Sequence, residues 1–287
     1  MKRIMTIQDV SCIGKCSLTV ALPIISAFGI ETAIVPTAVL STHTQFQGFT
    51  FRDLTEDLGP IREHWKKENF KFSAIYTGYL GSERQISIVK DYIHDFKTAD
   101  TKVIIDPVMA DNGKLYAGFD ERFPEKMAEL CKEADVILPN LSEAALMLGE
   151  PYPGEDAAPE ITKKLLKKLA KLEAGIVVIT GVTLKDGSFG FMGYDNQTKE
   201  FFEYGNPKVP FKSHGTGDIF ASTFTGALTK GFSTFDALKL AADYVTACIK
   251  NTYEDPERVN YAVNFELELP YLIKRITAPR TQDGVSA

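Results

Sequence analysis

Short apolar runs of strand length alternate with longer amphipathic runs along most of the chain, and this alternation restricts the fold most. Strands are expected over residues 2–8, 34–40, 72–77, 102–105, 135–138 and 175–179, and helices over residues 16–28, 61–70, 82–96, 124–132, 142–148 and 161–172. Strands that alternate with helices form a mostly parallel sheet covered on both faces. We therefore predict an α/β fold with three layers, a central sheet between two layers of helices.

The C-terminal third departs from this alternation. Residues 188–194 and 199–204 flank Asp195-Asn196 and are typical of a β-hairpin, and helices are expected over residues 218–230, 235–251 and 265–276. The Pro/Gly-rich stretch 149–159 is interpreted as a loop between two helices rather than a linker. We predict one domain over residues 1–276, followed by a flexible tail over residues 277–287.

Charge and cysteine content argue against several classes of protein. The chain has 32 Lys+Arg and 38 Asp+Glu, a formal net charge of −6, which disfavours a broad nucleic-acid surface. Its four cysteines form no Cys-x-x-Cys pair or disulfide framework, and no apolar run reaches the ~18 residues of a membrane span. We expect a cytoplasmic protein with reduced thiols that binds neither nucleic acid nor membrane.

Polar and glycine residues gather where the predicted strands end. They are Asp9, 41–45, 78–82, 106–111, 140–143 and Thr180-Gly181. Ligands of doubly wound sheets bind at the carboxyl ends of the strands. This arrangement predicts one small-molecule site.

The segment Gly215-Thr216-Gly217-Asp218 directly precedes an apolar helix. Its backbone amides and the positive helix end suit a phosphate, and Asp218 is placed to accept a proton from a hydroxyl that attacks that phosphate. The alternative is a plain helix cap, and these residues alone do not decide between the two. A Rossmann site is disfavoured because Phe220 replaces the third glycine, and Gly14-Lys15 is better explained as a strand-to-helix turn than as a Walker motif.

Two further strand ends carry oxygen ligands of the kind that Mg²⁺ prefers. Asp106 and Asp111 flank Pro107, while Asn140 and Glu143 lie three residues apart at the start of a helix. The alternative for Asn140 and Glu143 is an N-cap with its capping-box partner. His43, among hydroxyl residues, is as consistent with a structural histidine as with a ligand contact.

Taken together, these segments resemble the pyridoxal kinase family of the ribokinase-like superfamily. The resemblance runs from about residue 3 to residue 275, and its motifs are Ile7-Gln8, Ser41-Thr42-His43-Thr44-Gln45, Thr77-Gly78-Tyr79-Leu80-Gly81-Ser82, Asp106-Pro107-Val108-Met109, Pro139-Asn140 with Glu143, and Gly215-Thr216-Gly217-Asp218. The last motif marks the superfamily, whereas Ser-x-His-Thr and Gly-Tyr-Leu-Gly-Ser are more specific to the vitamin B6 branch.

The resemblance implies ATP-dependent phosphorylation of the 5′-hydroxymethyl group of pyridoxal, pyridoxine or pyridoxamine, in a homodimer without the separate lid of ribokinase. It makes Asp218 the general base and the amides of Gly215, Thr216 and Gly217 the anion hole. It also implies that Asp106 and Glu143 bind Mg²⁺, and a monovalent cation is a further candidate cofactor. The implied ligand contacts are His43, Thr44 and Tyr79 on the pyridine ring, and Asp106, Asp111, Tyr116, Asn140, Thr180, Thr216 and Gly217 around the nucleotide.

The chain departs from the family pattern at Asp9, where many pyridoxal kinases have a serine that faces the ring. A carboxylate there favours an ammonium substituent, so we hypothesise a preference for pyridoxamine. His214 is a second departure without an assigned role. Two alternatives to a B6 kinase stay open, namely a hydroxymethylpyrimidine (phosphate) kinase of thiamine synthesis and a non-catalytic B6-binding protein on the same fold.

Overall fold

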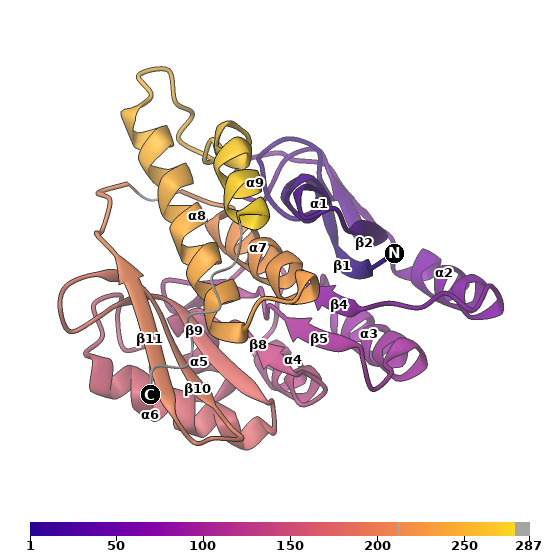
Figure 1. Cartoon of the computed structure of the whole chain (residues 1–287). Coiled ribbons are helices and arrows are strands. Elements are labelled where there is room, and N and C mark those ends of the chain that lie inside the picture. Colours follow the sequence, from indigo (N-terminus) through magenta and orange to yellow (C-terminus); the bar gives the residue numbers. More distant parts are fainter. Residues whose placement is uncertain (212, 279–287) are drawn as a thin grey trace.

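A nine-stranded sheet forms the centre of the computed structural model, which describes residues 1–211 and 213–278 (Figure 1). The strand order is β11-β10-β9-β8-β5-β4-β1-β2-β3. The strands from β9 to β2 in this order run parallel, whereas β3 at one edge and β10 and β11 at the other side are antiparallel to their neighbours. Their bounds are β1 Arg3–Ser11, β2 Glu31–Leu40, β3 Phe51–Asp53, β4 Ala74–Thr77, β5 Lys102–Ile105, β8 Val136–Ile137, β9 Ile176–Thr183, β10 Phe189–Asp195 and β11 Phe201–Asn206.

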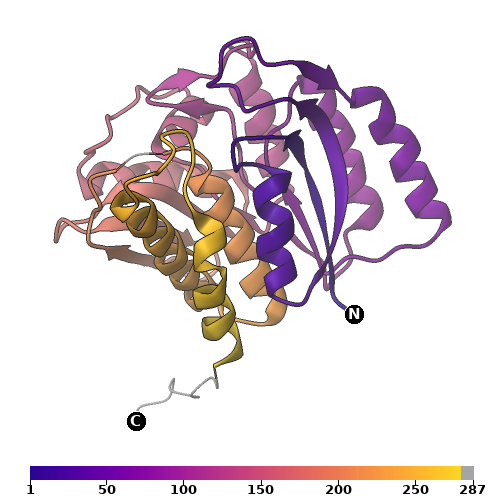
Figure 2. The same cartoon turned by 90° about the horizontal axis from the view of Figure 1, so that it is seen from above.

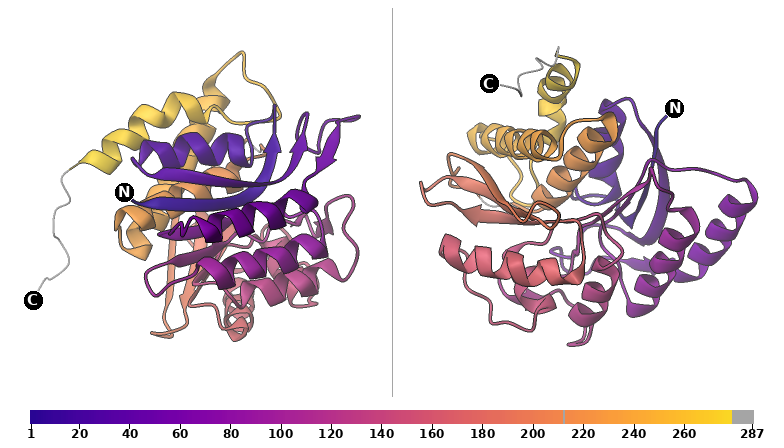
Figure 3. Two further views of the ribbon diagram at one scale, coloured as in Figure 1. Left: turned by 90° about the vertical axis from the view of Figure 1, so that its right-hand side faces the viewer. Right: turned by 60° about the horizontal axis from the view of Figure 1, so that its bottom comes forward.

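Helices cover both faces of this sheet, and Figures 2 and 3 show the two layers from other directions. One layer contains α2 (Thr55–Lys67), α3 (Glu83–Phe96), α4 (Phe123–Cys131), α5 (Leu141–Met147) and α6 (Pro159–Leu169), which η1 (Ala170–Leu172) extends. The other contains α1 (Leu18–Ala27), α7 (Thr216–Lys230), α8 (Thr234–Glu254), η2 (Phe265–Glu268) and α9 (Leu269–Thr277). The predicted three-layer α/β fold with a mostly parallel sheet is confirmed.

The two cores lie on opposite faces of the sheet because successive side chains of a strand point in opposite directions. Ile104 and Ile105 of β5 are both fully buried, yet Ile104 packs into the core beneath α1 and α7 while Ile105 packs into the core beneath α3 and α4. Strands buried on both faces appear as continuous apolar runs in the sequence. This explains why the strand over residues 102–105 could be predicted from its run of apolar residues alone.

Several boundaries differ from the prediction. β1 continues through Asp9 to Ser11, because Val10 and Ser11 still pair with β2, and the polar residues Gln8 and Asp9 are buried within it. β9 continues to Thr183, so Thr180 and Gly181 lie inside this strand rather than after it. The strands β3, β6 (Ala110–Asp111) and β7 (Lys114–Leu115) were not predicted, since two or three residues are too few to show a period.

The C-terminal end of the described chain is helical. Thr277, the first residue of the predicted tail, is the last residue of α9, and the tail from residue 279 onward lies outside the described residues. Over the residues that are described, no helix combines the length and the apolar character that crossing a membrane requires.

Candidate active site

The start of α7 presents backbone amides at the edge of the sheet where the parallel strands end. Its N-cap Gly215 has φ = 78°, and a Cβ there would lie 2.3 Å from the carbonyl oxygen of Lys15. Only glycine meets both requirements. Amides in the first turn of a helix have no partner within the helix, and Gly217 is exposed, so this end of α7 is open to an anion.

Asp218 lies in the first turn of α7 and is half-buried. Its Oδ2 accepts a hydrogen bond from the backbone N–H of Ser17 at 3.0 Å. Burial, together with the nearby charge of Asp9, raises the pKa of Asp218 to about 7, although the Ser17 bond acts in the opposite direction. A carboxylate with this pKa can take up a proton near neutral pH.

Asp9 lies at an irregularity of β1, because the register with β2 shifts between Gln8 and Val10. Such a bulge redirects the side chain of the residue that it contains. The Asp9 carboxylate is buried and accepts hydrogen bonds from the hydroxyls of Ser11 and Ser17. Burial raises its pKa, and the two hydroxyls and the nearby His43 oppose this effect.

Asp106 and Glu143 form a second pair of buried carboxylates, close to Asp218. Glu143 accepts hydrogen bonds from the N–H of Met109 at 3.2 Å and of Asn140 at 2.8 Å, and burial raises its pKa to about 8. Burial and the charges of Glu143 and Asp218 raise the pKa of Asp106 well above its usual range. Within the described ranges, no side chain or amide donates a hydrogen bond to the Asp106 carboxylate.

This donor set fits a divalent cation that is shared with a phosphate ligand. Mg²⁺ typically takes one or two protein carboxylates and completes its shell with water and phosphate oxygens. Residues 1–211 and 213–278 contain no group of three or more His, Cys, Asp or Glu side chains that could hold a metal ion by themselves. The unpaired charge of Asp106 beside Glu143 is what a cation would neutralise.

Asn140 caps α5, as the capping alternative predicted. Its Oδ1 accepts from the N–H of Glu143 at 2.9 Å, and the Glu143 side chain binds the N–H of Asn140 in return. The Nδ2 of Asn140 donates to the carbonyl oxygen of Ala110 at 2.9 Å. A backbone bridge also joins Asn140 to Thr180 of β9. These contacts bring Asn140 and Thr180 together, whereas their predicted contact with a nucleotide stays a prediction.

The short β6–β7 hairpin lies beside the two buried carboxylates. Asp111 is exposed on it, and Tyr116, which follows β7, donates its N–H to the carbonyl oxygen of Met109 at 2.9 Å. Burial raises the pKa of the Tyr116 hydroxyl, and the charges of Glu143 and Asp111 add to this effect. The hairpin therefore places Tyr116 near Glu143 and Asp111, and the contact of Asp111 and Tyr116 with a nucleotide stays a prediction.

Aromatic side chains surround His43 at the opposite side of the site. The His43 ring lies 4.9 Å from the ring of Phe46, 5.8 Å from that of His214 and 6.1 Å from that of Tyr261. Gln45 contacts the Nε2 of His214, and the charge of Asp9 acts on His43. This arrangement connects the loop after β2 with the segment that leads into α7.

The remaining predicted ring contacts lie near this cluster. Tyr79 is half-buried, its ring is 5.6 Å from that of Phe119, and burial together with the charge of Asp9 raises its pKa to about 12. Thr44 is exposed on the same loop as His43. The structure thus places Tyr79 beside Asp9, and it leaves the Thr44 side chain on the surface.

Three contributors to this site have no signal in the sequence. Ser17 binds both Asp9 and Asp218, and Tyr261 and Phe46 pack around His43. The serine had no signal because a hydroxyl near a helix start is usually a cap, and Tyr261 comes from a loop far along the chain. Gly14 and Lys15 lie between β1 and α1, which confirms the strand-to-helix turn, and the Lys15 amine pairs with Glu266 at 2.9 Å.

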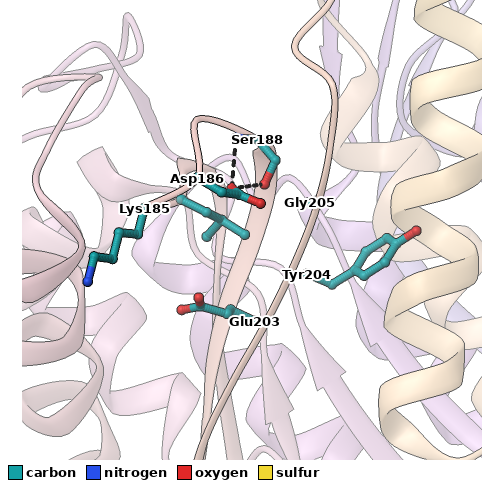
Figure 4. Close-up of a pocket in the computed structure, with 7 residues that line it drawn as sticks. Lys185, Asp186, Ser188, Glu203, Tyr204 and Gly205 are labelled. Atoms are coloured by element: carbon teal, nitrogen blue, oxygen red, sulfur yellow. Dashed lines mark hydrogen bonds between the residues drawn. The ribbon is translucent and has the colours of Figure 1, made fainter.

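Two cavities lie near the same edge of the sheet. One, of about 440 Å³, is lined by the β9–β10 turn and by Glu203, Tyr204 and Gly205 of β11 (Figure 4). In Figure 4 Glu203 and Tyr204 point to opposite sides of β11, and Asp186 binds Ser188. The second, of about 150 Å³, lies between residues 81–83 and 118–123. Gly81 and Ser82, from the predicted strand-end segment 78–82, line the second cavity, whereas the four acidic residues of the site line neither of the two; these are Asp9, Asp106, Glu143 and Asp218.

Comparison with known proteins agrees with this geometry. The model of the phosphomethylpyrimidine kinase family matches residues 25–263. A Bacteroides thetaiotaomicron protein, a provisionally assigned phosphomethylpyrimidine kinase solved with pyridoxal, is 38% identical with a TM-score of 0.89, and the match covers 98% of this chain and 97% of that one. The pyridoxal kinase of Lactobacillus plantarum is 29% identical with a TM-score of 0.87, over 96% and 98% of the two chains.

The hydroxymethylpyrimidine/phosphomethylpyrimidine kinase of Aquifex aeolicus is also related, with 28% identity over 78% of this chain and 85% of its own. Relatives named for both substrate classes are therefore similar to this chain in sequence over most of its length. The family model spans most of the sequence, including Asp106, Glu143, Thr180 and Asp218. The chain belongs to the phosphomethylpyrimidine kinase family of the ribokinase-like superfamily, the group in which the pyridoxal kinases are also found.

Proposed function

We propose that this protein uses ATP to phosphorylate the 5′-hydroxymethyl group of a vitamin B6 vitamer. The observation that carries the proposal is the position of Asp218, a half-buried carboxylate with its pKa raised to about 7, directly beside the open amides at the start of α7. Simple binding of a phosphate would not need a base at this place. A base beside an anion site is what the transfer of a phosphoryl group to an alcohol requires.

In this mechanism Asp218 accepts the proton of the substrate hydroxyl while the hydroxyl oxygen forms a bond to the γ-phosphorus of ATP. The bond from that phosphorus to the β-phosphate oxygen breaks, and ADP leaves. The amides of Gly215, Thr216 and Gly217 bind the oxygens of the phosphoryl group as charge develops on them. Their orientation is set in advance by the αL conformation of Gly215.

The carboxylates of Asp106 and Glu143 would hold Mg²⁺, either directly or through water. A bound Mg²⁺ supplies positive charge that neutralises the phosphate oxygens during transfer. The peptide N–H groups of Met109 and Asn140 fix the Glu143 carboxylate, so this side of the site needs little rearrangement. The phosphates would be bordered by Asp111 and Tyr116 of the β6–β7 hairpin segment and by Thr180. The cavity beside β11 would have room for the adenine ring of the nucleotide.

Asp9, His43, Thr44 and Tyr79 would contact the pyridine ring and its substituents. The assignment of a B6 vitamer is supported by the related Bacteroides thetaiotaomicron protein, which was solved with pyridoxal. Each oxygen of the Asp9 carboxylate accepts one hydrogen bond, from Ser11 or from Ser17, and a ligand group would bind at a remaining lone pair. An ammonium group would form a charge-assisted bond there, which favours pyridoxamine.

A second candidate is a hydroxymethylpyrimidine or phosphomethylpyrimidine kinase. The family model and the Aquifex aeolicus relative favour it, because that substrate class presents the same hydroxymethyl group to the base. The B6 proposal also places the protein in the cytoplasm as a homodimer.

A panel of substrates separates these functions. The wild-type protein and Asp218→Asn are assayed with ATP and Mg²⁺ on pyridoxal, pyridoxine, pyridoxamine and hydroxymethylpyrimidine. We expect turnover of at least one B6 vitamer, and Asp218→Asn should lower it by roughly 10²–10⁴-fold while ligand binding is retained. Turnover of hydroxymethylpyrimidine alone would support the second candidate. Full activity of Asp218→Asn would contradict the role of the base.

A further inference from the structure

Ser17 makes hydrogen bonds to both acidic groups at the centre of the site. Its hydroxyl donates to Oδ1 of Asp9 in β1, and its backbone N–H donates to Oδ2 of Asp218 in α7 at 3.0 Å. Ser17 is buried and caps α1 at its N-terminus. One residue therefore joins a strand to the start of a helix that comes about 200 positions later in the chain.

The turn that carries Ser17 has an unusual backbone. Ser17 has φ = 52° and ψ = −134°, and Gly14 and Lys15 before it also have positive φ values. A residue with a Cβ adopts such a conformation only at a cost in conformational energy, which glycine would avoid. What Ser17 has and glycine lacks is the hydroxyl, and that hydroxyl contacts Asp9.

The groups around the two carboxylates are mostly acidic or weakly polar. The charge of Asp9 acts on Asp218, and the charge of Asp218 acts in turn on Cys16 of the same turn, on Asp106 at the end of β5 and on the hydroxyls of Tyr76 and Tyr116. The cationic amine of Lys15 is turned away, toward Glu266. Among the described residues, no lysine or arginine forms an ion pair with Asp9 or Asp218, and hydrogen bonds from Ser11 and Ser17 hold the two carboxylates in place.

We propose that Ser17 is a positioning residue that couples Asp9 to the catalytic base Asp218. The charged hydrogen bond to Asp9 fixes the Ser17 backbone in its strained conformation, and this conformation aims the Ser17 N–H at Asp218. The inference rests on the proposed phosphoryl transfer for its kinetic consequence. It applies equally to any hydroxymethyl substrate, because it concerns the base and not the ring.

A double-mutant cycle tests this coupling. Wild type, Ser17→Ala, Asp9→Asn and the double variant are assayed on whichever hydroxymethyl compound the wild type phosphorylates fastest. We expect Ser17→Ala to lower kcat about tenfold with the KM for ATP within about twofold, since one bond to a charged group is lost. In the Asp9→Asn background the same change should lower kcat by less than about threefold. Additive effects on kcat would overturn the proposal.

Two further variants separate positioning from a structural role. Thr19→Ala removes a hydroxyl that donates to the Cys16 carbonyl oxygen at 2.8 Å in the same turn, without contact to either carboxylate. Thr19→Ala should change kcat less than about twofold. A loss of kcat equal to that of Ser17→Ala would contradict a specific positioning role of Ser17. Ser17→Gly relieves the backbone strain and lacks the hydroxyl, so it should share the tenfold loss. Wild-type kcat in Ser17→Gly would refute the inference.

Urea unfolding of the same four proteins of the cycle gives a readout that needs no substrate. The free energies of unfolding should show a favourable coupling between Ser17 and Asp9, and additive values would overturn the linkage whatever the kinetics. If the wild type phosphorylates none of the compounds, the proposed function fails. The unfolding cycle then decides the Ser17–Asp9 linkage by itself.

Discussion

The Nε2–H of His43 donates a hydrogen bond to the carbonyl oxygen of Tyr261 at 3.2 Å. The other ring nitrogen, Nδ1, accepts from the N–H of Gln45 at 3.3 Å, so the imidazole is neutral with its proton on Nε2. Burial lowers the pKa of His43 and so supports the neutral form. Through this bond the loop after β2 holds the loop between α8 and η2 against the site.

The first prediction concerns this bond. His43→Ala should raise the KM for the vitamer roughly tenfold and should speed amide hydrogen exchange in residues 255–264, because the tie to Tyr261 is lost. His43→Gln keeps a donor near the position of Nε2 and lacks the ring. It should retain the slow exchange while still raising KM. Wild-type exchange in His43→Ala would show that the bond does not hold the loop.

The second prediction compares two glycines of one loop. Gly215→Ala places a Cβ 2.3 Å from the Lys15 carbonyl oxygen at φ = 78°, whereas a Cβ at Gly217 meets nothing within 4 Å. We expect Gly215→Ala to lower the free energy of unfolding by about 2 kcal/mol or more and Gly217→Ala to leave it within about 0.5 kcal/mol. Urea unfolding measures both. If Gly217→Ala lowers kcat/KM for ATP without a loss of stability, the added methyl group is crowding a phosphate of ATP. Equal stability of the two variants would contradict the contact between residue 215 and the Lys15 carbonyl oxygen.

The third prediction is a pH profile. Asp218 acts as a base only when it is ionised, and its pKa is raised to about 7, so kcat/KM should fall about tenfold per pH unit below that value. Asp9→Asn removes a negative neighbour and should shift this limb toward lower pH. Values of kcat/KM measured from pH 5 to pH 9 check both statements. If Asp9→Asn leaves the acidic limb of the profile at the same pH, the charge of Asp9 does not affect the pKa of Asp218.

The same pKa has a consequence for stability. The folded-state pKa of Asp218 lies above its ordinary value of 3.8, so its protonated form favours folding below about pH 4, and this contribution is lost as the pH rises through about 7. Asp218→Asn should therefore exceed wild type in free energy of unfolding by about 1–2 kcal/mol at pH 8, with a smaller gain at pH 5. A pH-independent difference would contradict this sign.

The fourth prediction concerns magnesium. Asp106→Asn removes a carboxylate that no described residue hydrogen-bonds, so it should raise the Mg²⁺ concentration for half-maximal activity by roughly tenfold or more. It also removes like-charge repulsion with Glu143 and Asp218, so the metal-free protein should not lose stability. Asp111→Asn, at an exposed position of the hairpin, should change the Mg²⁺ requirement less. A larger increase in the Mg²⁺ requirement for Asp111→Asn than for Asp106→Asn would indicate that the metal binds at the hairpin instead.

The fifth prediction concerns the vitamer. Asp9→Ser should lower the ratio of kcat/KM for pyridoxamine to kcat/KM for pyridoxal severalfold, because the charge-assisted bond to the ammonium group is lost. The ratio is the proper measure, since any change at Asp218 affects both substrates alike. Asp9→Asn keeps the size of the side chain and should lower the ratio in the same direction. An unchanged ranking of the vitamers would refute the preference.

Much of the layered fold is visible in the sequence itself. The runs around Ile104 and around Val177 are apolar at successive positions, as strands buried on both faces must be. The helix over residues 83–96 shows its buried positions every three or four residues. Local periodicity reports how many faces an element buries, so the order of strands and helices could be predicted. It also marked Asp106, Glu143 and Asp218, which lie at or near element ends.

The contacts that complete the site depend on the tertiary structure. Ser17 and Asp218 are 201 positions apart, and His43 and Tyr261 are 218 positions apart, so no local pattern could relate them. The bulge at Asp9 likewise depends on the pairing of β1 with β2. The sequence by itself determined the layers and the acidic residues at the strand ends, because these follow from short-range periodicity. Only the packed sheet decided which of them share one site and how burial shifts their pKa values, because both depend on long-range contacts.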